Sequence, residues 1–321
     1  MRASRATLVA LLMGDDRTAS GQALAESLLP AIASRHPSRV LMVRLSPTAP
    51  PGRLSASVSA LCTRGEGARY VCCEKIDIEA GPGAEPSLPG AILSLILGDL
   101  PLVLWAPREI PCEASWFRSL LTSSDRLVFD SAALRSPAAD LRALSSLTGA
   151  FSRVEPADFE WVRLTGWRRR IAAAFDPPEA RALAQDGFER VTFVEPSRAA
   201  PSARRARQGI LADESPAESA ASAASLLLKV WVSGRVRVRT FQWSSGGPSQ
   251  ASPPAPDALS YEASRDLRAI RFEGRRNGAA ALIEVPAPRG NRAASPTDLV
   301  TLIGGQPDNP LSPRSSAKGT P

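Results

Sequence analysis

Histidine and cysteine are scarce in this chain. One histidine, His36, and four cysteines occur among 321 residues, and no two cysteines are spaced as C-x-x-C. Structural zinc sites are built from Cys and His pairs at short, set spacings, so we predict no metal site. A chain of this length can build its cores without disulfide bonds, which favours a reducing cytoplasm as its location.

The sequence also lacks three motifs that mark common enzyme classes. The loop after the first predicted strand has Gly14 and Gly21 with no glycine between them, so it does not match the dinucleotide fingerprint G-x-G-x-x-G. Neither a G-x-x-x-x-G-K-[ST] phosphate loop nor a G-x-S-x-G nucleophile elbow occurs. His36 is interpreted as a cation at a helix C-terminus rather than as a catalytic base. We therefore predict that the protein is not an enzyme and has no catalytic residues and no cofactor.

Apolar runs long enough to cross a membrane are missing. The run from Ala6 to Met13 is followed by Gly-Asp-Asp instead of a small-residue cleavage site, so we interpret it as a buried strand and not as a signal peptide. The run at 91–107 is interrupted by Gly98, Asp99 and Pro101, and it cannot cross a bilayer as one helix. We predict no membrane partner.

Positive charge exceeds negative charge, with a formal net charge of +7. Basic clusters at 168–171 and 202–209 raise the hypothesis of a nucleic-acid partner. The second cluster contains no aromatic residue, and the chain matches no known nucleic-acid-binding module. We therefore predict a solvated loop there and no nucleic-acid partner.

Strand and helix patterns alternate through the first half of the chain. Residues 6–13 and 38–46 read as strands around a helix at 18–37, which is the β-α-β unit of a parallel sheet. Two runs at 53–64 and 68–80 predict an antiparallel addition to that sheet. Further helices are predicted at 87–99, 115–125 and 136–149, with buried strands at 100–107 and 125–132. The fold class is α/β, with a layered N-terminal domain and a mostly parallel sheet at 1–157.

The second half predicts an α+β domain at 158–304. A strand is expected at 187–196 and a helix at 215–235, with Ser215 as its N-cap and Glu218 completing a capping box. Short strands of an antiparallel sheet are expected at 235–243, 267–274, 280–288 and 298–304. The composition of residues 305–321 predicts a disordered tail.

Residues 158–178, DFEWVRLTGWRRRIAAAFDPP, lie between the two predicted domains. We expect one junction helix here, which Asp158 caps and the two prolines end. Helical spacing places the apolar residues on one face and leaves Arg163 and Arg170 exposed on another. Burial in a core or domain interface and contact with a partner both remain open; the apolar face comprises Trp161, Leu164, Ile171 and Phe175, with Trp167 beside it.

The cysteines allow two interpretations. Cys72 and Cys73 are adjacent, so on a strand they point to opposite faces, and one of them could face Cys62 on a neighbouring strand. Such a pair would be a redox site if its Cα atoms lay within about 7 Å. The alternative is that all three are small buried apolar residues.

Several segments together resemble a known family. HPSRVLMVRL, CCEKIDIEA, LPLVLWAP, DRLVFDSA and DFEWVRLTGWRRRIAAAFDPP occur in this order, and they are similar to the glucose-6-phosphate dehydrogenase assembly protein family, OpcA. The resemblance covers residues 20–285. It implies a two-domain, non-enzymatic protein that binds glucose-6-phosphate dehydrogenase and promotes its active oligomer. It also marks as family-motif or partner-binding residues Trp105, Asp158, Trp161, Arg163, Trp167 and Arg168.

A second hypothesis is a small-molecule-binding α/β protein or enzyme that acts on a nucleotide or a sugar phosphate. Ligands of open parallel sheets bind at the carboxyl ends of the strands. The acidic loop at 14–16, Arg108 and Ser131 each follow a predicted strand and are expected at that edge.

Overall fold

The structure is a computed structural model that describes most of the predicted elements. Contacts divide the chain into two compact units. The first holds the described residues up to Ala133 together with Ala143–Phe159, and the second holds Leu134–Arg142 and the described residues from Glu160 onward. The described residues are 6–12, 29, 38–64, 70–96, 98, 100–107, 110–134, 136–151, 153–196, 221–246, 267–276 and 279–287. The predicted tail at 305–321, the predicted strand at 298–304 and most of the predicted helix at 18–37 lie outside them.

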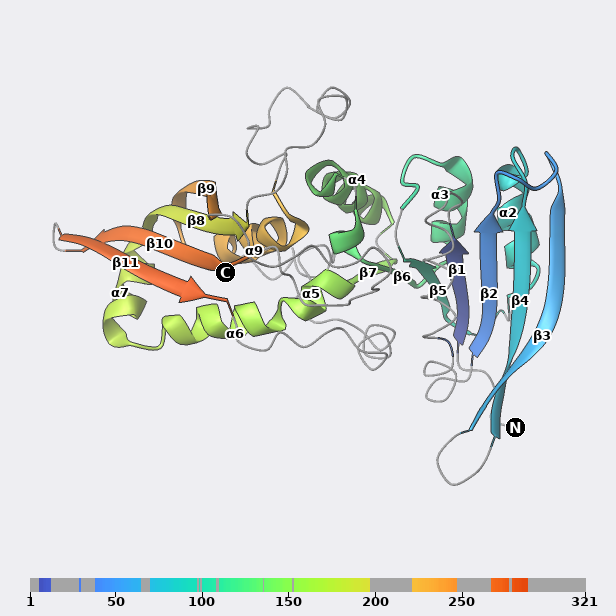
Figure 1. Cartoon of the computed structure of the whole chain (residues 1–321), viewed down its shortest axis with the longest axis horizontal. Helices are drawn as coiled ribbons and strands as arrows, with labels where there is room; N and C mark the ends of the chain where they lie inside the picture. Colours follow the sequence, from blue (N-terminus) through green and yellow to red (C-terminus); the bar gives the residue numbers. More distant parts are fainter. Residues whose placement is uncertain are drawn as a thin grey trace. The chain divides into compact units, whose positions relative to one another are not determined.

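A seven-stranded sheet, sheet A, forms the first unit, with strand order β3-β4-β2-β1-β5-β6-β7 (Figure 1). All neighbours pair in parallel except β3 and β4, which are antiparallel. The strands are β1 (Ala6–Leu12), β2 (Ser38–Leu45), β3 (Leu54–Arg64), β4 (Tyr70–Ala80), β5 (Leu102–Ala106), β6 (Arg126–Phe129) and β7 (Glu155–Asp158). The α/β fold class predicted for this part is confirmed, including its antiparallel addition.

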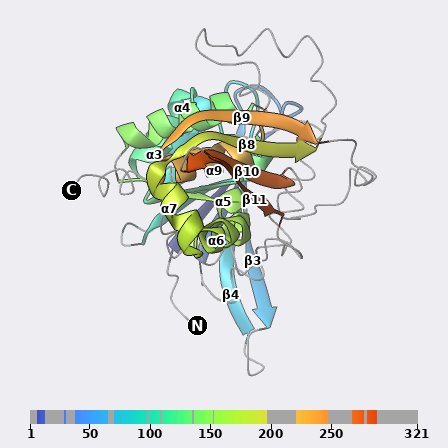
Figure 2. The same cartoon turned by 90° about the vertical axis from the view of Figure 1, so that its left-hand side faces the viewer.

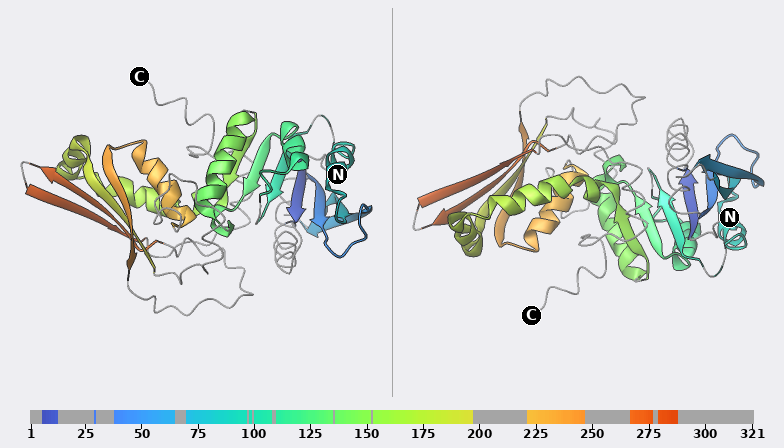
Figure 3. Two further views of the ribbon diagram at one scale, coloured as in Figure 1. Left: turned by 90° about the horizontal axis from the view of Figure 1, so that it is seen from above. Right: turned by 90° about the horizontal axis from the view of Figure 1, so that it is seen from below.

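The core of sheet A lies in its central strands. Every residue of β5 is buried, as expected for a short apolar strand covered on both faces. The helices α2 (Leu88–Leu93) and α3 (Ser115–Thr122) lie on one face of the sheet (Figure 3). Two short 3-10 helices also occur: η2 (Glu85–Ser87) lies between β4 and α2, and η3 (Ser131–Ala133) follows β6.

Helix α2 is shorter than the sequence predicted. It ends at Leu93, and the chain leaves the helical pattern at Ser94, whose hydroxyl donates to the carbonyl of Ala91. A side-chain bond of this kind competes with the helix for the backbone carbonyl. Helix α4 (Pro137–Ala150) matches its predicted range to within one residue at each end.

A four-stranded sheet, sheet B, forms the second unit, with order β11-β10-β8-β9 (Figure 2). Its strands are β8 (Phe188–Pro196), β9 (Val238–Gly246), β10 (Ala269–Arg276) and β11 (Ala279–Pro286). The expectation of a fully antiparallel sheet was wrong, because β8 and β9 pair in parallel. Helix α9 (Ala223–Ser233) connects these two strands, and parallel neighbours require a crossover of this kind.

Helices α6 (Thr165–Ala174), α7 (Pro178–Asp186) and α9 lie on one face of sheet B (Figure 3). An aromatic cluster fills part of that face, with the ring centroids of Phe175, Phe188 and Phe272 between 5.2 and 5.8 Å apart. Helix α9 begins later than predicted, with Ser222 as its N-cap, and Ser215 and Glu218 lie outside the described residues. Among the described residues, no helix is long and apolar enough to cross a membrane.

Candidate functional site

The stretch 158–178 contains two short helices instead of one long helix, and its last residue begins a third helix. Asp158 is the last residue of β7 and directly precedes the first of these helices, which is the position predicted for it. Helix α5 (Phe159–Arg163) follows at once and is separated from α6 by Leu164 alone. The amide of Leu164 donates to the carbonyl of Glu160, and the amide of Arg168 donates to Leu164, so the helical hydrogen bonds continue across the break. Helix α7 begins at Pro178, where a proline at the first turn costs no hydrogen bond.

Both tryptophans of this stretch are inside the protein. Trp161 and Trp167 are each 0% exposed. The guanidinium carbon of Arg168 lies 3.9 Å from the centroid of the Trp161 ring, which is a cation–π contact. Burial was one of the two interpretations left open, and these two side chains present no surface to a partner in this structure.

Arg163 does not lie on an exposed face, so that expectation was wrong. Its guanidinium donates to the carboxylate of Glu160 at 2.8 Å, and the two side chains are only 4% and 2% exposed. Three residues apart on one helix, the two can pair directly. Burial at this level makes the pair part of the core, because charged groups are buried only when they are paired.

Helix α6 carries two further arginines, Arg169 and Arg170, after Arg168. Arg169 is exposed. Arg170 is half-buried, and it donates to the carbonyls of Pro286 at 3.3 Å and Ala287 at 3.2 Å, at the end of β11. Among the arginines of residues 158–178, Arg169 is therefore the most accessible to another protein.

Asp158 and Ser131 lie together at the carboxyl edge of sheet A. The Asp158 carboxylate accepts from the Ser131 amide at 3.0 Å and from its hydroxyl at 2.7 Å, and both residues are fully buried. Ser131 was predicted to line a ligand pocket, but its hydroxyl points into the core. The other two predicted parts of that pocket, the loop at 14–16 and Arg108, lie outside the described residues. Trp105, on β5, is also fully buried.

Cys62 and Cys72 form a disulfide bond between β3 and β4. They are direct partners in the antiparallel register, with Cα atoms 4.0 Å apart. Cys62 is exposed, so the interpretation of all three residues as small buried apolar side chains was wrong. Cys73 is a free, buried thiol on the opposite face, and burial raises its pKa.

The three cysteines should differ in their reactivity toward an alkylating reagent such as iodoacetamide. Only the thiolate reacts, so buried Cys73 should be labelled slowly at about pH 8, and Cys62 and Cys72 should be labelled rapidly only after reduction. Peptide mass spectrometry with and without dithiothreitol would measure both rates. Rapid labelling of Cys62 in the unreduced protein would contradict the disulfide.

A buried polar network at the start of α9 was not predicted. One oxygen of the Glu195 carboxylate accepts from the Ser222 amide at 3.0 Å and from the hydroxyls of Ser222 and Ser225, both at 2.7 Å. The indole of Trp243 donates to the Ser225 hydroxyl at 3.0 Å. A carboxylate at a helix N-terminus is favoured by the helix dipole, so Glu195 occupies the position that an anionic ligand would need.

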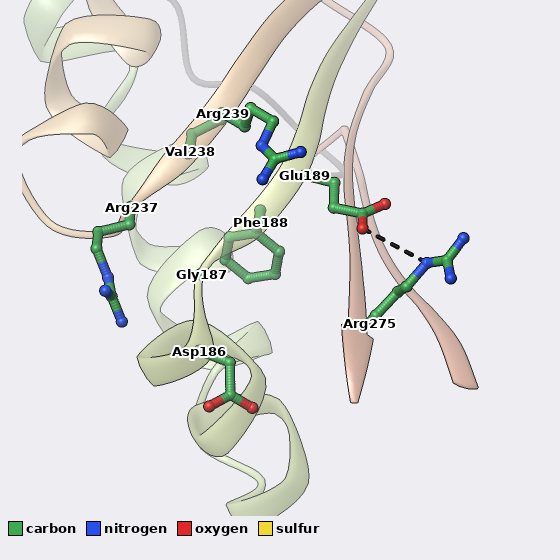
Figure 4. Close-up of a pocket in the computed structure, with 8 residues that line it drawn as sticks. All are labelled: Asp186, Gly187, Phe188, Glu189, Arg237, Val238, Arg239 and Arg275. Atoms are coloured by element: carbon green, nitrogen blue, oxygen red, sulfur yellow. Dashed lines mark ion pairs between the residues drawn. The ribbon is translucent and has the colours of Figure 1, made fainter. Parts of the chain in front are cut away.

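A shallow groove of about 480 Å³ opens between the C-terminus of α7 and the first residues of β8 and β9 (Figure 4). Glu189 and Arg275 form an ion pair of 3.4 Å at one side. Arg237 points away from that pair and donates to the carbonyl of Gln185 at 2.7 Å. The guanidinium groups do not converge on one point, so the groove lacks the geometry of an anion site. No cluster of metal-ligating side chains occurs among the residues that the structure describes.

Comparison with known proteins finds one matching family model and several curated relatives. The model of the family OpcA_G6PD_assem, described as "Glucose-6-phosphate dehydrogenase subunit N-terminal domain", matches residues 30–146. Two curated cyanobacterial relatives bear the name "Putative OxPP cycle protein OpcA". The one from Synechococcus elongatus is 36% identical over 154 residues, which are 47% of this chain and 34% of the relative. The one from Nostoc punctiforme is 32% identical over 165 residues, 50% of this chain and 34% of the relative.

The matched region spans about a third of the length of these relatives. Similarity to solved structures is weaker. A glucose-6-phosphate 1-dehydrogenase from Mycobacterium avium gives a TM-score of 0.42 at 10% identity, covering 96% of this chain and 88% of that one. A glucose-6-phosphate dehydrogenase in complex with glucose-6-phosphate gives a TM-score of 0.38 at 11% identity, covering 98% and 88%. Similarities this weak support no conclusion about function.

Four of the sequence segments described above, at 36–45, 72–80, 100–107 and 125–132, lie within the residues that the family model matches, whereas the segment at 158–178 lies outside them. Through residues 30–146 the chain is thus similar to the family OpcA_G6PD_assem, and about half of the chain is similar to relatives named OpcA.

Proposed function

We propose that this protein is a non-enzymatic factor that binds glucose-6-phosphate dehydrogenase and promotes its active oligomer, in support of the oxidative pentose phosphate pathway. The observation that carries the proposal is the family match over residues 30–146. Within the described part of that range lie β2 to β6, with the helices between them. The matched part of the chain thus lies mostly in the first unit.

The buried carboxylates support a role without catalysis. Asp158 binds Ser131, Glu160 binds Arg163, and Glu195 binds Ser222 and Ser225. A catalytic carboxylate has to reach a substrate or a water molecule. These three are less than 9% exposed and are engaged by their own chain, so they stabilise the fold.

Mixing the purified chain with the dehydrogenase of the same organism tests the proposal. Light scattering after gel filtration would measure the mass of the complex, and the rate of glucose-6-phosphate oxidation would measure activity. We expect co-elution, a larger dehydrogenase oligomer and a higher rate. Separate elution with an unchanged oligomer and an unchanged rate would refute the proposal.

A charge reversal at the exposed Arg169 tests whether helix α6 contacts the dehydrogenase. Arg169→Glu reverses a charge on the outward side of α6 without removing a core contact. If this side touches the dehydrogenase, affinity should fall about tenfold, which corresponds to about 1.4 kcal/mol. Titration calorimetry of the full chain would measure the change.

Arg239→Glu is the matched control, because Arg239 is also exposed and lies in the same unit, on β9. It should bind like the unmodified chain. Equal affinities for both variants and the unmodified chain would place the contact away from α6.

A further inference from the structure

Among the described residues, strand β3 is an uncovered edge of sheet A. It pairs with β4 on one side, and its residues from Ser55 to Ala60 are all exposed. Val58 is 67% exposed, the largest value among the exposed large apolar side chains of the described residues. An edge strand presents a row of unpaired N–H and C=O groups, which another strand can extend.

The other sheet edges carry features that discourage pairing. Strand β7 has four residues and contains Pro156. Strand β9 carries the exposed Arg239, and β11 carries Glu284 and ends at Pro286. Short length, proline and charge are the usual protections of an edge. Strand β3 has eleven residues, and from Leu54 to Cys62 it contains neither charge nor proline.

The apolar face of the sheet continues onto β3 without cover. Val58 and Ala56 stand directly opposite Ile76 and Ile78 of β4, so they point to the same face. The two isoleucines are each 3% exposed, whereas Val58 and Ala56 are exposed. The core thus stops at β4, although the apolar pattern extends one strand further.

We propose that β3 pairs in antiparallel fashion with β3 of a second copy of this chain, about a two-fold axis at Val58. Val58 is the midpoint of the uncharged stretch 54–62. In this register Val58 faces the partner's Val58, Ala56 faces Ala60, and Ser57 faces Ser59. On the face of Val58, apolar side chains meet apolar ones. On the other face Ser57 meets Ser59 and Ser55 meets Leu61, and no like charges are opposed.

The backbone supports the same register. Cys62 and Cys72 have Cα atoms 4.0 Å apart, which matches the closely spaced, non-hydrogen-bonded pair of an antiparallel ladder. Pairs alternate along the ladder, so Val58 also belongs to a non-hydrogen-bonded pair with β4. Its N–H and C=O therefore point outward, and they can exchange two hydrogen bonds with Val58 of the second copy.

Cysteine cross-linking of the full chain tests the register. Val58→Cys places two thiols opposite each other on the axis, and mild oxidation should give a covalent dimer in non-reducing electrophoresis. Ser145→Cys, exposed on α4, is the matched control and should remain monomeric.

A charge exchange tests the pairing itself. Sedimentation at about 100 µM, where interfaces of modest area associate, should show a dimer for the unmodified chain. Val58→Lys and Val58→Glu should each be monomeric, because like charges meet at the axis. An equimolar mixture of the two should restore a dimer, which simple misfolding of either variant would not do.

A monomeric unmodified chain, or a Val58→Lys variant as dimeric as that chain, would overturn the proposal. If the unmodified chain is monomeric and Val58→Lys loses binding to the dehydrogenase, the edge belongs to that partner and the self-pairing is wrong. Failure of the proposed function is a separate result, since the unmodified chain would then not bind the dehydrogenase at all.

Discussion

Replacing Trp161 with alanine should lower the free energy of unfolding by about 3–5 kcal/mol. The side chain is 0% exposed, and it lies under the guanidinium of Arg168 at 3.9 Å. Alanine would remove the ring's buried surface, open a cavity and leave the arginine without its aromatic partner. Urea denaturation followed by far-ultraviolet circular dichroism would measure the loss.

Two variants sharpen this prediction. Trp161→Phe keeps an aromatic ring below Arg168, and the indole N–H of Trp161 has no hydrogen-bond partner among the described residues, so phenylalanine should cost much less than alanine. Trp231→Ala removes a half-exposed ring on α9 that Arg235 covers at 4.4 Å. Its cost should be about 1 kcal/mol. Equal losses for Trp161→Ala and Trp231→Ala would contradict the burial of Trp161.

Removing one member of the Glu160–Arg163 pair should cost about 3–5 kcal/mol. Glu160→Ala leaves the Arg163 guanidinium, 4% exposed, without its carboxylate at 2.8 Å. Little solvent reaches the site to replace that partner. A double-mutant cycle with Arg163→Met would measure the coupling, and the double variant should lose less stability than the sum of the single variants.

An exposed ion pair of the same unit serves as the control. Arg271 and Glu284 join β10 to β11 at 2.6 Å, with side chains 44% and 45% exposed. Glu284→Ala should cost at most about 1 kcal/mol, because water solvates both charges when they separate. A Glu160→Ala variant as stable as Glu284→Ala would show that the helix pair is open to solvent.

Local patterns in the sequence were sufficient for the main architecture. The continuous apolar run at 102–106 and the β-α-β alternation predicted a parallel sheet, because only strands covered on both faces are apolar at every position. The fold class of both parts followed from such patterns. The parallel pairing of β8 with β9 did not, since strand order depends on how α9 crosses the sheet.

The sequence was sufficient to identify residues 158–178 as the candidate site. It was not sufficient to predict which of their charged side chains are exposed. Helical spacing indicated the buried face of Trp161, and it placed Arg163 elsewhere on the helix. Spacing alone could not show that Arg163 is also buried, because that depends on what packs around the helix. Glu160 and Arg163 are three residues apart on a helix, and this spacing was the sequence signal that the two side chains could form an ion pair.

Contacts between distant residues were decided by the tertiary structure alone. Asp158 reaches Ser131, 27 positions away, because β6 and β7 end side by side. The sequence offered Cys72 and Cys73 equally as partners for Cys62, and only the register of β3 on β4 selects Cys72. A shift of one residue would turn the opposite face of β4 toward Cys62. The sequence by itself determined most of the elements and which of their faces are apolar, since both depend on neighbours along the chain. The short elements β7 and α7, the break between α5 and α6, and the strand order and register depend on how the elements pack.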